Sequence, residues 1–240
     1  MKTKYPKKVD WSTYKFRCSS LGNLMPGPRA KPGQIQVTQQ TELSKIFLRE
    51  VWGFEKQFST KQMEKGEYCE PEGIKILCDQ IYSGVPYLKN TERLSNEFIM
   101  GTPDLNAFKH KAVHDVKASW DLDTFFRSSA DKSNEFQIKG YGWLLGYETL
   151  EVDKTLMSAP DHIRDRELAW LERRYEQQGK DFDSPEFERE HKSLELSLNY
   201  DRIPVEKRLK RFPVAWDPDF PDFIRDNVLI LRNELQNMSL

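Results

Sequence analysis

The spacing of hydrophobic residues alternates along the chain between a helical period and a strand-like one. Helical spacing predicts helices at 19–25, 41–52, 59–81, 135–146, 160–178, from 184 onwards and at 221–237. Between 87 and 118 the pattern is strand-like, with strands expected at 98–100, 105–108 and 113–117, and further strands at 155–157 and 209–216. This order of elements predicts an α/β fold built on one central sheet.

Local signals set several helix boundaries. Gly53 is expected to end the helix over 41–52, and Ser59-Thr60-Lys61-Gln62 is typical of a capping box that starts the next helix. Pro71 lies inside that second helix, which therefore either kinks or divides into two helices. Ser184 followed by Pro185 indicates the start of another helix, with proline at its first position.

The composition indicates a globular protein of 240 residues, with 38% hydrophobic and 31% charged residues and a net charge of −1. A chain of this length buries roughly 70–75% of its unfolded surface, so a single domain can hold a charged site without disulfides. The three cysteines show no metal-ligand spacing, and their odd number without a signal peptide indicates a reducing cytoplasm. The apolar runs are too short to cross a membrane.

Basic residues cluster near both ends of the chain. We expect these runs to be solvated faces in preference to phosphate-binding surfaces, since charge alone does not distinguish the two. The runs are Lys2, Lys4, Lys7 and Lys8 at the start, and Lys207, Arg208, Lys210 and Arg211 near the end.

Two aspartates and a lysine interrupt the strand-like region. Residues i and i+2 of a strand share a face, so Asp115 and Lys117 point the same way. Asp104 lies 115 − 104 = 11 residues earlier, which allows a strand to turn near 109–111 and return beside itself. Converging carboxylates repel unless a divalent cation lies between them, and oxygen ligands suit Mg²⁺ or Mn²⁺. A nearby lysine suits phosphodiester hydrolysis, but the spacing alone favours a charged surface hairpin.

Further residues shift this balance, because four motifs resemble those of the PD-(D/E)XK nuclease superfamily. Pro103-Asp104 with Asp115-Val116-Lys117 matches the motif that names the superfamily. Gln137-Ile-Lys-Gly-Tyr141 resembles the Q-x-x-x-Y motif of its RecB and lambda-exonuclease branch, and Gly66-Glu-Tyr-Cys-Glu70 resembles the upstream glutamate motif. Phe16-Arg17-Cys18-Ser19-Ser20-Leu21-Gly22 is similar to the entry motif of YqaJ-type phage exonucleases. The resemblance spans about residues 16–160, weakens through 206–212, and favours a nuclease.

The resemblance implies a role for each residue of the hairpin. Asp104 and Asp115 would bind the metal together with the carbonyl of Val116. Lys117 would orient and activate the attacking water. Glu70 would hold a metal or a metal-bound water, although Pro71 next to it leaves the local geometry open, so that Glu67 or Glu72 could substitute.

Residues outside the hairpin would complete the site. Gln137 and Tyr141, one helical turn apart, would brace it and touch the DNA backbone. Arg17, Ser19 and Ser20 would contact phosphate, unless Arg17 is merely a solvated charge and Ser19 caps the short helix.

Other candidates have plainer explanations. His114 alternates to the face opposite Asp115, and His110 falls in the turn of the hairpin. Asp121 and Asp123 are expected to cap the following helix.

The implied protein is one nuclease domain with a restriction-endonuclease-like core, a central mixed sheet flanked by helices, an N-terminal arm over 1–16 and a C-terminal elaboration over 161–240. Its expected function is Mg²⁺-dependent exonuclease action on linear double-stranded DNA in phage-type recombination or repair, with Mn²⁺ as a substitute cofactor. It would act in the cytoplasm of a bacterial host or phage-infected cell, alongside a single-strand annealing protein. The family includes ring-forming members and monomers, and no motif here chooses between them.

Two alternatives remain open at this point. One is an endonuclease of restriction or junction-resolving type on the same core. The other is a catalytically silent module that only binds DNA or a recombination partner.

Overall fold

The computed structural model describes residues 5–27, 30–31, 33–56, 60–83, 85 and 87–240. Its α-helices are α1 (Leu21–Leu24), α2 (Val37–Trp52), α3 (Lys61–Ile81), α4 (Leu122–Phe126), α5 (Lys132–Leu145), α6 (Asp161–Gln177), α7 (Pro185–Leu198) and α8 (Phe220–Asn237). Its strands are β1 (Phe16–Arg17), β2 (Leu94–Ser95), β3 (Ile99–Gly101), β4 (Leu105–Ala107), β5 (Ala112–Ser119), β6 (Thr149–Leu156) and β7 (Leu209–Val214). Short 3₁₀ turns are η1 (Trp11–Thr13), η2 (Cys18–Ser20), η3 (Phe108–His110) and η4 (Val205–Lys207).

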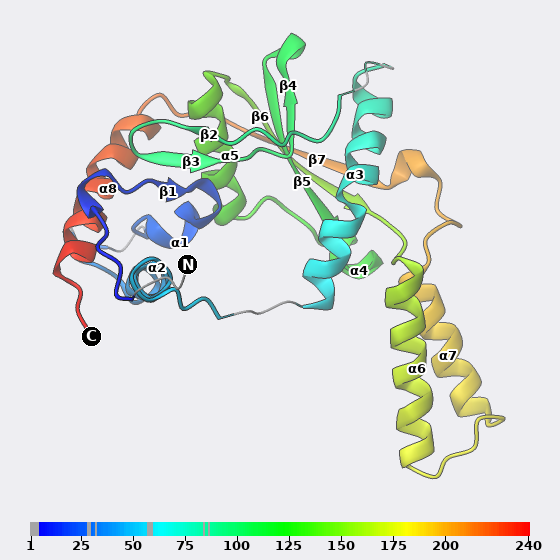
Figure 1. The fold of residues 1–240 in the computed structure, drawn as a ribbon. Coiled ribbons are helices and arrows are strands. Elements are labelled where there is room, and N and C mark those ends of the chain that lie inside the picture. The colour runs from blue at the N-terminus through cyan, green and yellow to red at the C-terminus, as the bar shows by residue number, and fades with distance from the viewer. Residues whose placement is uncertain (1–4, 28–29, 32, 57–59, 84, 86) are drawn as a thin grey trace.

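A four-stranded mixed sheet in the order β4-β5-β6-β7 forms the centre of the fold (Figure 1). β5 is antiparallel to β4 and parallel to β6, and β7 runs antiparallel to β6. The α/β fold with a mixed sheet and flanking helices, expected from the motifs, is confirmed. The predicted strand at 155–157 is only the end of β6, which begins at Thr149.

Two hydrophobic cores lie on the two faces of this sheet. On one face, Val113 and Val152 pack with Ile138 and Tyr141 of α5. On the other face, Val116 packs with residues of α3, among them Ile74 and Leu77. Neighbouring residues of β5 therefore point into different layers, as the alternation of a strand requires.

A second, three-stranded sheet in the order β1-β3-β2 corrects the expectation of a single sheet. Phe16 and Arg17 pair in parallel with Ile99 and Met100. The sequence gives no periodic signal over two residues, so this pairing escaped prediction. It places the entry motif next to the segment that leads into the β4–β5 hairpin.

α3 is a single helix despite Pro71 in its interior. Thr60 caps it, since its hydroxyl accepts a hydrogen bond from the Met63 N–H at 3.2 Å; Ser59, the first residue of the predicted capping box, lies outside the described residues, as do Lys2 and Lys4 of the first basic run. A Cβ at Gly73 would lie 3.0 Å from Thr155 Oγ1 and 3.2 Å from Val116 Cγ1. This close approach to the sheet explains why α3 has glycine there.

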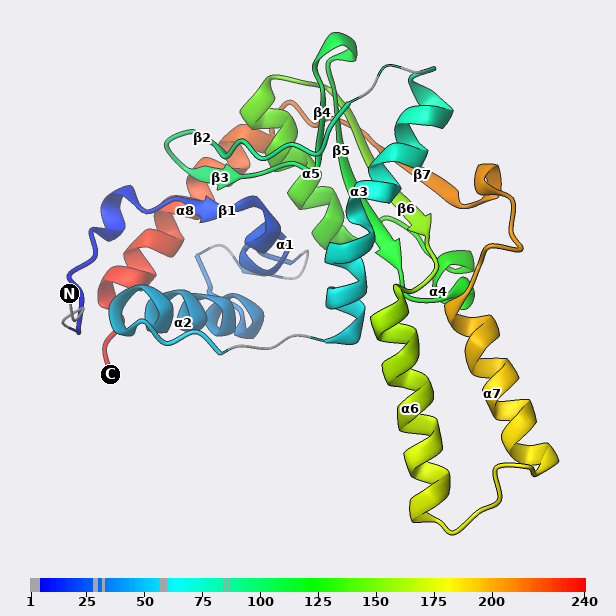
Figure 2. The ribbon, with the colours of Figure 1, turned by 45° about the vertical axis from the view of Figure 1, so that its right-hand side comes forward.

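The C-terminal part of the chain extends and covers the core. α6 and α7 form a helical hairpin that projects away from the sheet (Figures 1 and 2). Ser184 caps α7 by accepting from the Phe187 N–H, as predicted. α8 returns to the first core, where Ile224, Val228 and Leu231 are buried. Within the described part of the chain, we find no helix that is long and apolar enough to cross a membrane.

Candidate active site

Asp115 and Lys117 form the centre of a charged cluster on the α5 face of β5. Asp115 is fully buried, and Lys117 Nζ donates to its Oδ1 at 2.8 Å. Asp115 Oδ2 is also buried and has no hydrogen-bond partner among the described residues. The motif therefore places a carboxylate oxygen in the interior without the partner that burial normally requires.

Asp104 lies directly before β4 and reaches the same cluster. Its Oδ2 accepts a hydrogen bond from the Val116 N–H at 2.8 Å. Since the N–H and C=O of one strand residue point to the same neighbour, the Val116 carbonyl also faces the Asp104 edge of β5. Burial, followed by the charges of Asp115 and Glu70, raises the pKa of Asp104 to about 7.

Gln137 and Tyr141 brace Asp115 from α5. Gln137 Nε2 lies 2.9 Å from Asp115 Oδ1 and 3.0 Å from the Tyr141 hydroxyl. Both side chains are buried, and burial, followed by the charge of Asp115, raises the pKa of Tyr141. Their contact with DNA stays a prediction, whereas the contacts with Asp115 fit the expected bracing role.

Glu70 approaches the cluster from α3. It is half-buried, whereas Glu67 and Glu72 are exposed, and its charge acts on both Asp104 and Lys117. Lys89 Nζ lies 3.0 Å from Glu70 Oε1, but that oxygen has no partner in hydrogen-bond geometry. Of the three glutamates, Glu70 is thus the one that faces the hairpin.

The chemistry of this donor set fits a divalent cation. Three carboxylates from separate elements act on one another, and two of them present buried oxygens without hydrogen bonds, Asp115 Oδ2 and Glu70 Oε1. In the described part of the chain, the carboxylate oxygens of Glu70, Asp104 and Asp115 do not all lie within 4.8 Å of one another. In this arrangement the three residues are therefore too far apart to bind one cation together. Two of these carboxylates contact other groups, Glu70 through Lys89 and Asp104 through the Val116 N–H.

A second group of acids lies on the α3 face of the sheet, behind Asp115. His114, Glu151 and Asp153 have potential ligand atoms within 4.8 Å of one another, so this group could hold a divalent cation. In the structure, protein groups already occupy it. His114 Nδ1 lies 2.7 Å from Asp153 Oδ2 and its Nε2 lies 2.6 Å from the Tyr82 hydroxyl, while Arg211 donates to both oxygens of Glu151.

Sequence reasoning placed His114 on this opposite face but did not connect it with Glu151 and Asp153. The available signal was the alternation Glu151-x-Asp153, which puts both acids on one face of a strand. Asp121 caps α4 through the Thr124 N–H, as predicted, whereas Asp123 lies inside α4 and pairs with Arg127. His110 ends the η3 turn of the hairpin, also as predicted.

Arg17, Ser19 and Ser20 line one cavity of about 550 Å³ beside α2. Two acidic residues and three further basic residues also line it, namely Glu42, Glu55, Lys45, Arg49 and Lys56. The Ser20 hydroxyl donates to Glu42 at 3.1 Å. Neither η2 nor α1 has a side-chain cap, so the alternative that Ser19 caps the short helix is wrong.

The entry motif, part of which lines this cavity, lies against α5. A Cβ at Gly140 would lie 2.9 Å from Cys18 Sγ, and one at Gly22 would lie 2.5 Å from the Ser133 backbone. The entry motif therefore packs tightly on the helix that carries Gln137 and Tyr141.

No protein-family model and no curated protein sequence matches this chain. Among solved structures, a phage-related exonuclease from Haemophilus somnus 129PT aligns over 93% of this chain and 94% of its own, with a TM-score of 0.73 and 23% identity. An alkaline exonuclease from Laribacter hongkongensis aligns over 94% of this chain and 91% of its own, with a TM-score of 0.57 and 11% identity. The same enzyme in complex with dAMP gives a TM-score of 0.56 at 12% identity, over 92% of this chain and 88% of its own.

The chain has the fold of these exonucleases. The alignments with the first two structures cover more than nine tenths of this chain and of each partner, so the shared fold extends well beyond the central sheet. The fold class predicted from the four motifs is thereby confirmed.

Proposed function

We propose that this protein is a Mg²⁺-dependent deoxyribonuclease that degrades linear double-stranded DNA from its ends. One observation supports it most directly. Asp104, Asp115 and Lys117 lie together at the centre of an exonuclease fold, with Asp104 bonded to the backbone of the Asp115-Val116-Lys117 strand at 2.8 Å.

The metal would be held by Asp104, Asp115 and the Val116 carbonyl, with Glu70 binding it directly or through water. When bound, Mg²⁺ supplies Lewis-acid stabilisation of the phosphate and lowers the pKa of a water that it coordinates. Mn²⁺ offers the same oxygen preference.

Lys117 has a separate role beside the metal ligands. Asp115 and Asp104 raise its pKa in spite of burial, so it stays an ammonium near neutral pH. In that form it donates hydrogen bonds and stabilises negative charge that develops on the phosphate or on the attacking oxygen. Gln137 keeps Asp115 in place by donating to the oxygen that Lys117 also contacts.

The cavity around Arg17 would hold the end of a strand. Arg17 is exposed at its rim, and the lining has four basic and two acidic side chains, which gives an excess of two positive charges. A terminal phosphate carries more charge than an internal one, so such a cavity favours phosphorylated ends. This would restrict the enzyme to linear DNA.

The experiment compares linear duplex with covalently closed plasmid, each with Mg²⁺ or EDTA. We expect digestion of the linear duplex with Mg²⁺ alone and no change in the closed circle. Nicking or linearisation of the plasmid would support the endonuclease alternative, and absence of cleavage with retained DNA binding would support the silent module.

The end-binding role has its own test on the same substrates. Removing the 5′ phosphates, or the substitution Arg17→Ala, should slow digestion of linear duplex without changing the melting temperature. If neither change affects digestion, the exonuclease proposal stands, but Arg17 does not belong to the site that binds the strand end. Co-purification with the full chain would test for a single-strand annealing partner. The mass of the protein in solution would test whether it forms a ring.

A further inference from the structure

Three lysines lie in register across the central sheet, on the face that carries Asp115. Lys117 of β5 pairs with Lys154 of β6, and Lys154 pairs with Lys210 of β7. Paired residues of neighbouring strands share a face and lie roughly 5 Å apart. Like charges opposite one another destabilise a sheet, so this row of lysines calls for a functional reason.

Lys154 and Lys210 are both held by neutral acceptors. Lys154 Nζ donates to Asn134 Oδ1 in the first turn of α5 at 3.1 Å. Lys210 Nζ donates to the Phe126 carbonyl in α4 at 2.6 Å. Among the residues that the structure describes, no carboxylate forms a salt bridge with either ammonium, and their hydrogen bonds go to uncharged oxygens.

The position of Lys154 is costly for an ammonium because it is partly buried. Burial lowers its pKa, the charges of Asp115 and Asp131 offset this in part, and the ammonium of Lys117 lowers it slightly further. Asp131 is itself engaged as the cap of α5, where it accepts from the Asn134 N–H at 2.8 Å. An anion beside Lys154 would relieve this cost.

An exposed aromatic ring stands at the far end of the row. The Phe126 side chain is 77% exposed, and Lys210 Nζ lies 5.4 Å from the centre of its ring. α4 lies beside the end of β6 (Figure 2), and Lys210, the last lysine of the row, contacts the Phe126 ring. A line of cations with an exposed aromatic residue is the arrangement that binds single-stranded nucleic acid, since phosphates meet the cations and bases stack on the ring.

We propose that Lys154, Lys210 and Phe126 form a track for single-stranded DNA that leads from Asp115 across the sheet. Lys154 and Lys210 would bind successive backbone phosphates next to the one that is cleaved, and Phe126 would stack on a base. A duplex fits less well, because paired bases are stacked on each other and do not offer a free face to Phe126. This inference rests on the proposed nuclease function, since that function brings a strand to Asp115.

The test measures binding of a short fluorescent oligothymidylate to the full chain in EDTA, over a range of NaCl concentrations. Each phosphate contact contributes about 0.7 to the slope of log K against log salt for a single strand. Lys154→Met and Lys210→Met should each reduce the slope by about 0.7, and the double variant by about 1.4. Phe126→Ala should weaken binding roughly tenfold and leave the slope unchanged.

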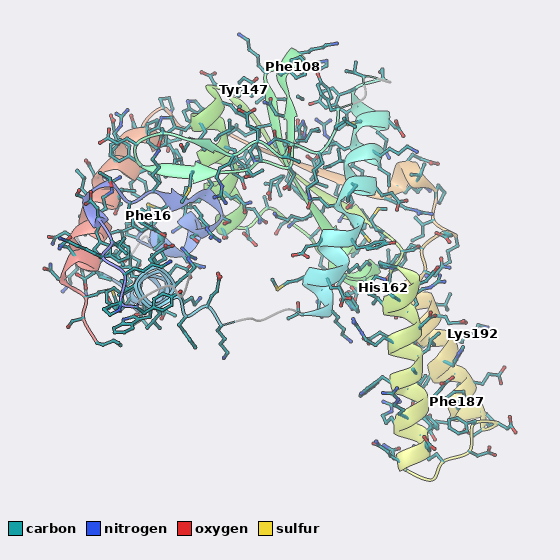
Figure 3. The ribbon with its side chains drawn as sticks, in the orientation of Figure 1. Phe16, Phe108, Tyr147, His162, Phe187 and Lys192 are labelled. Carbon is teal, nitrogen blue, oxygen red and sulfur yellow. The ribbon has the colours of Figure 1, made fainter. Side chains whose placement is uncertain are left out.

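Lys192→Met is the matched control. Lys192 is exposed on α7, in the hairpin that projects away from the sheet (Figure 3), and its loss removes the same charge. It should leave both the slope and the affinity unchanged. Methionine is chosen because it preserves the length of the aliphatic part of Lys154, which is partly buried. If Lys154→Met lowers the melting temperature, Lys210→Met tests the track by itself, because Lys210 is half-exposed.

The track would be overturned if Lys154→Met and Lys210→Met, with unchanged melting temperatures, show the wild-type slope of log K against log salt. Equal losses in the Lys192→Met control would overturn it too, because the binding would then depend on overall charge. The proposed function fails separately, if the wild-type chain does not cut linear DNA with Mg²⁺. Cleavage by the wild type together with unchanged slopes would refute only the track.

Discussion

Both faces of β5 bury acidic residues, but the interaction partners of these residues differ between the two faces. On the α3 face, His114 meets Asp153 at 2.7 Å, and Arg211 donates to both oxygens of Glu151. Asp153 Oδ1 lacks a hydrogen bond, but Arg211 Nε lies only 3.9 Å from it. The acids on this face are balanced by protein groups.

On the α5 face, the acids face one another. Asp115 has one oxygen bonded to Lys117 and Gln137 and one without any partner among the described residues. Its charge also raises the pKa of Asp104. Buried polar groups normally find partners, and perturbed groups that do not are typical of functional sites. The comparison teaches that burial of acids alone does not mark the site, because both faces bury them.

The largest effect is expected from Asp115→Ala. It removes a central ligand from the α5 face, so cleavage of linear duplex should fall by at least about 10²- to 10³-fold. DNA binding should persist, because fewer carboxylates then face the phosphates. Single-turnover cleavage and fluorescence anisotropy measure the two effects. Cleavage at the wild-type rate would show that the assignment of the site is wrong.

Asp153→Ala tests the other face. Removing one partner from a buried pair costs about 3–5 kcal/mol of unfolding free energy, because His114 is left buried without its carboxylate. Urea unfolding measures this loss, and the cleavage rate per folded molecule should change far less than in Asp115→Ala. The opposite pattern, with stability intact and cleavage lost, would reverse the roles of the two faces.

A chelator distinguishes the two interpretations of the His114, Glu151 and Asp153 group. If protein groups are the only partners of these three side chains, EDTA leaves the melting temperature of the wild type unchanged. A lower melting temperature in EDTA that Asp153→Ala abolishes would show that a cation stabilises this face.

Within the α5 face, Lys117 and Gln137 should differ. Lys117→Ala should lose on the order of 10²-fold in rate, as when a single preorganised donor is removed. Gln137→Ala should lose less, since Gln137 acts only through the position of Asp115. Rates at saturating Mg²⁺ provide the measurement. A larger loss for Gln137→Ala would mean that the two roles are exchanged.

The α5 face could be predicted from the sequence because its key residues are local. Asp115 and Lys117 are two residues apart, and Gln137 and Tyr141 are one helical turn apart. The turn between β4 and β5 brings Asp104 beside the strand that carries Asp115. Short-range periodicity places Asp115 with Lys117 and Gln137 with Tyr141, and the resemblance to the nuclease motifs joins the two pairs into one expected site. The motifs therefore identify the cluster before its geometry is known.

The rest depends on pairing over long distances. Most of β6 was missed because Glu151, Asp153 and Lys154 make it resemble a charged loop. Their partners come from elsewhere in the sequence, with Arg211 60 residues beyond Glu151. Charged residues are depleted from strands, and only the tertiary partners explain their presence here. The β1–β3 pairing escaped prediction because a strand of two residues has no periodic signal.

The smallest expected effect concerns Lys65, a cation buried on the α3 face with neutral partners. Its Nζ donates to the carbonyls of Ser119 and Trp120 at 3.0 and 2.7 Å, at the end of β5. Burial lowers the pKa of Lys65 from 10.5 to about 8. Carbonyls thus satisfy its hydrogen bonds without offsetting its charge, in contrast to the ion pairs of Arg211.

The sign of the pH dependence follows from this lowered pKa. Between about pH 8 and 10.5 the folded chain binds fewer protons at Lys65 than the unfolded chain, so its contribution to the unfolding free energy rises with pH in that window. The rise should be on the order of 1–2 kcal/mol between about pH 8 and pH 10. Because other groups also titrate there, the measurement is the difference in urea unfolding between the wild type and Lys65→Met at the two pH values. Lys65→Met lacks the titrating group, so the wild type should gain stability relative to it as the pH rises. A constant difference would mean that the carbonyls of Ser119 and Trp120 compensate the buried charge as fully as a carboxylate does.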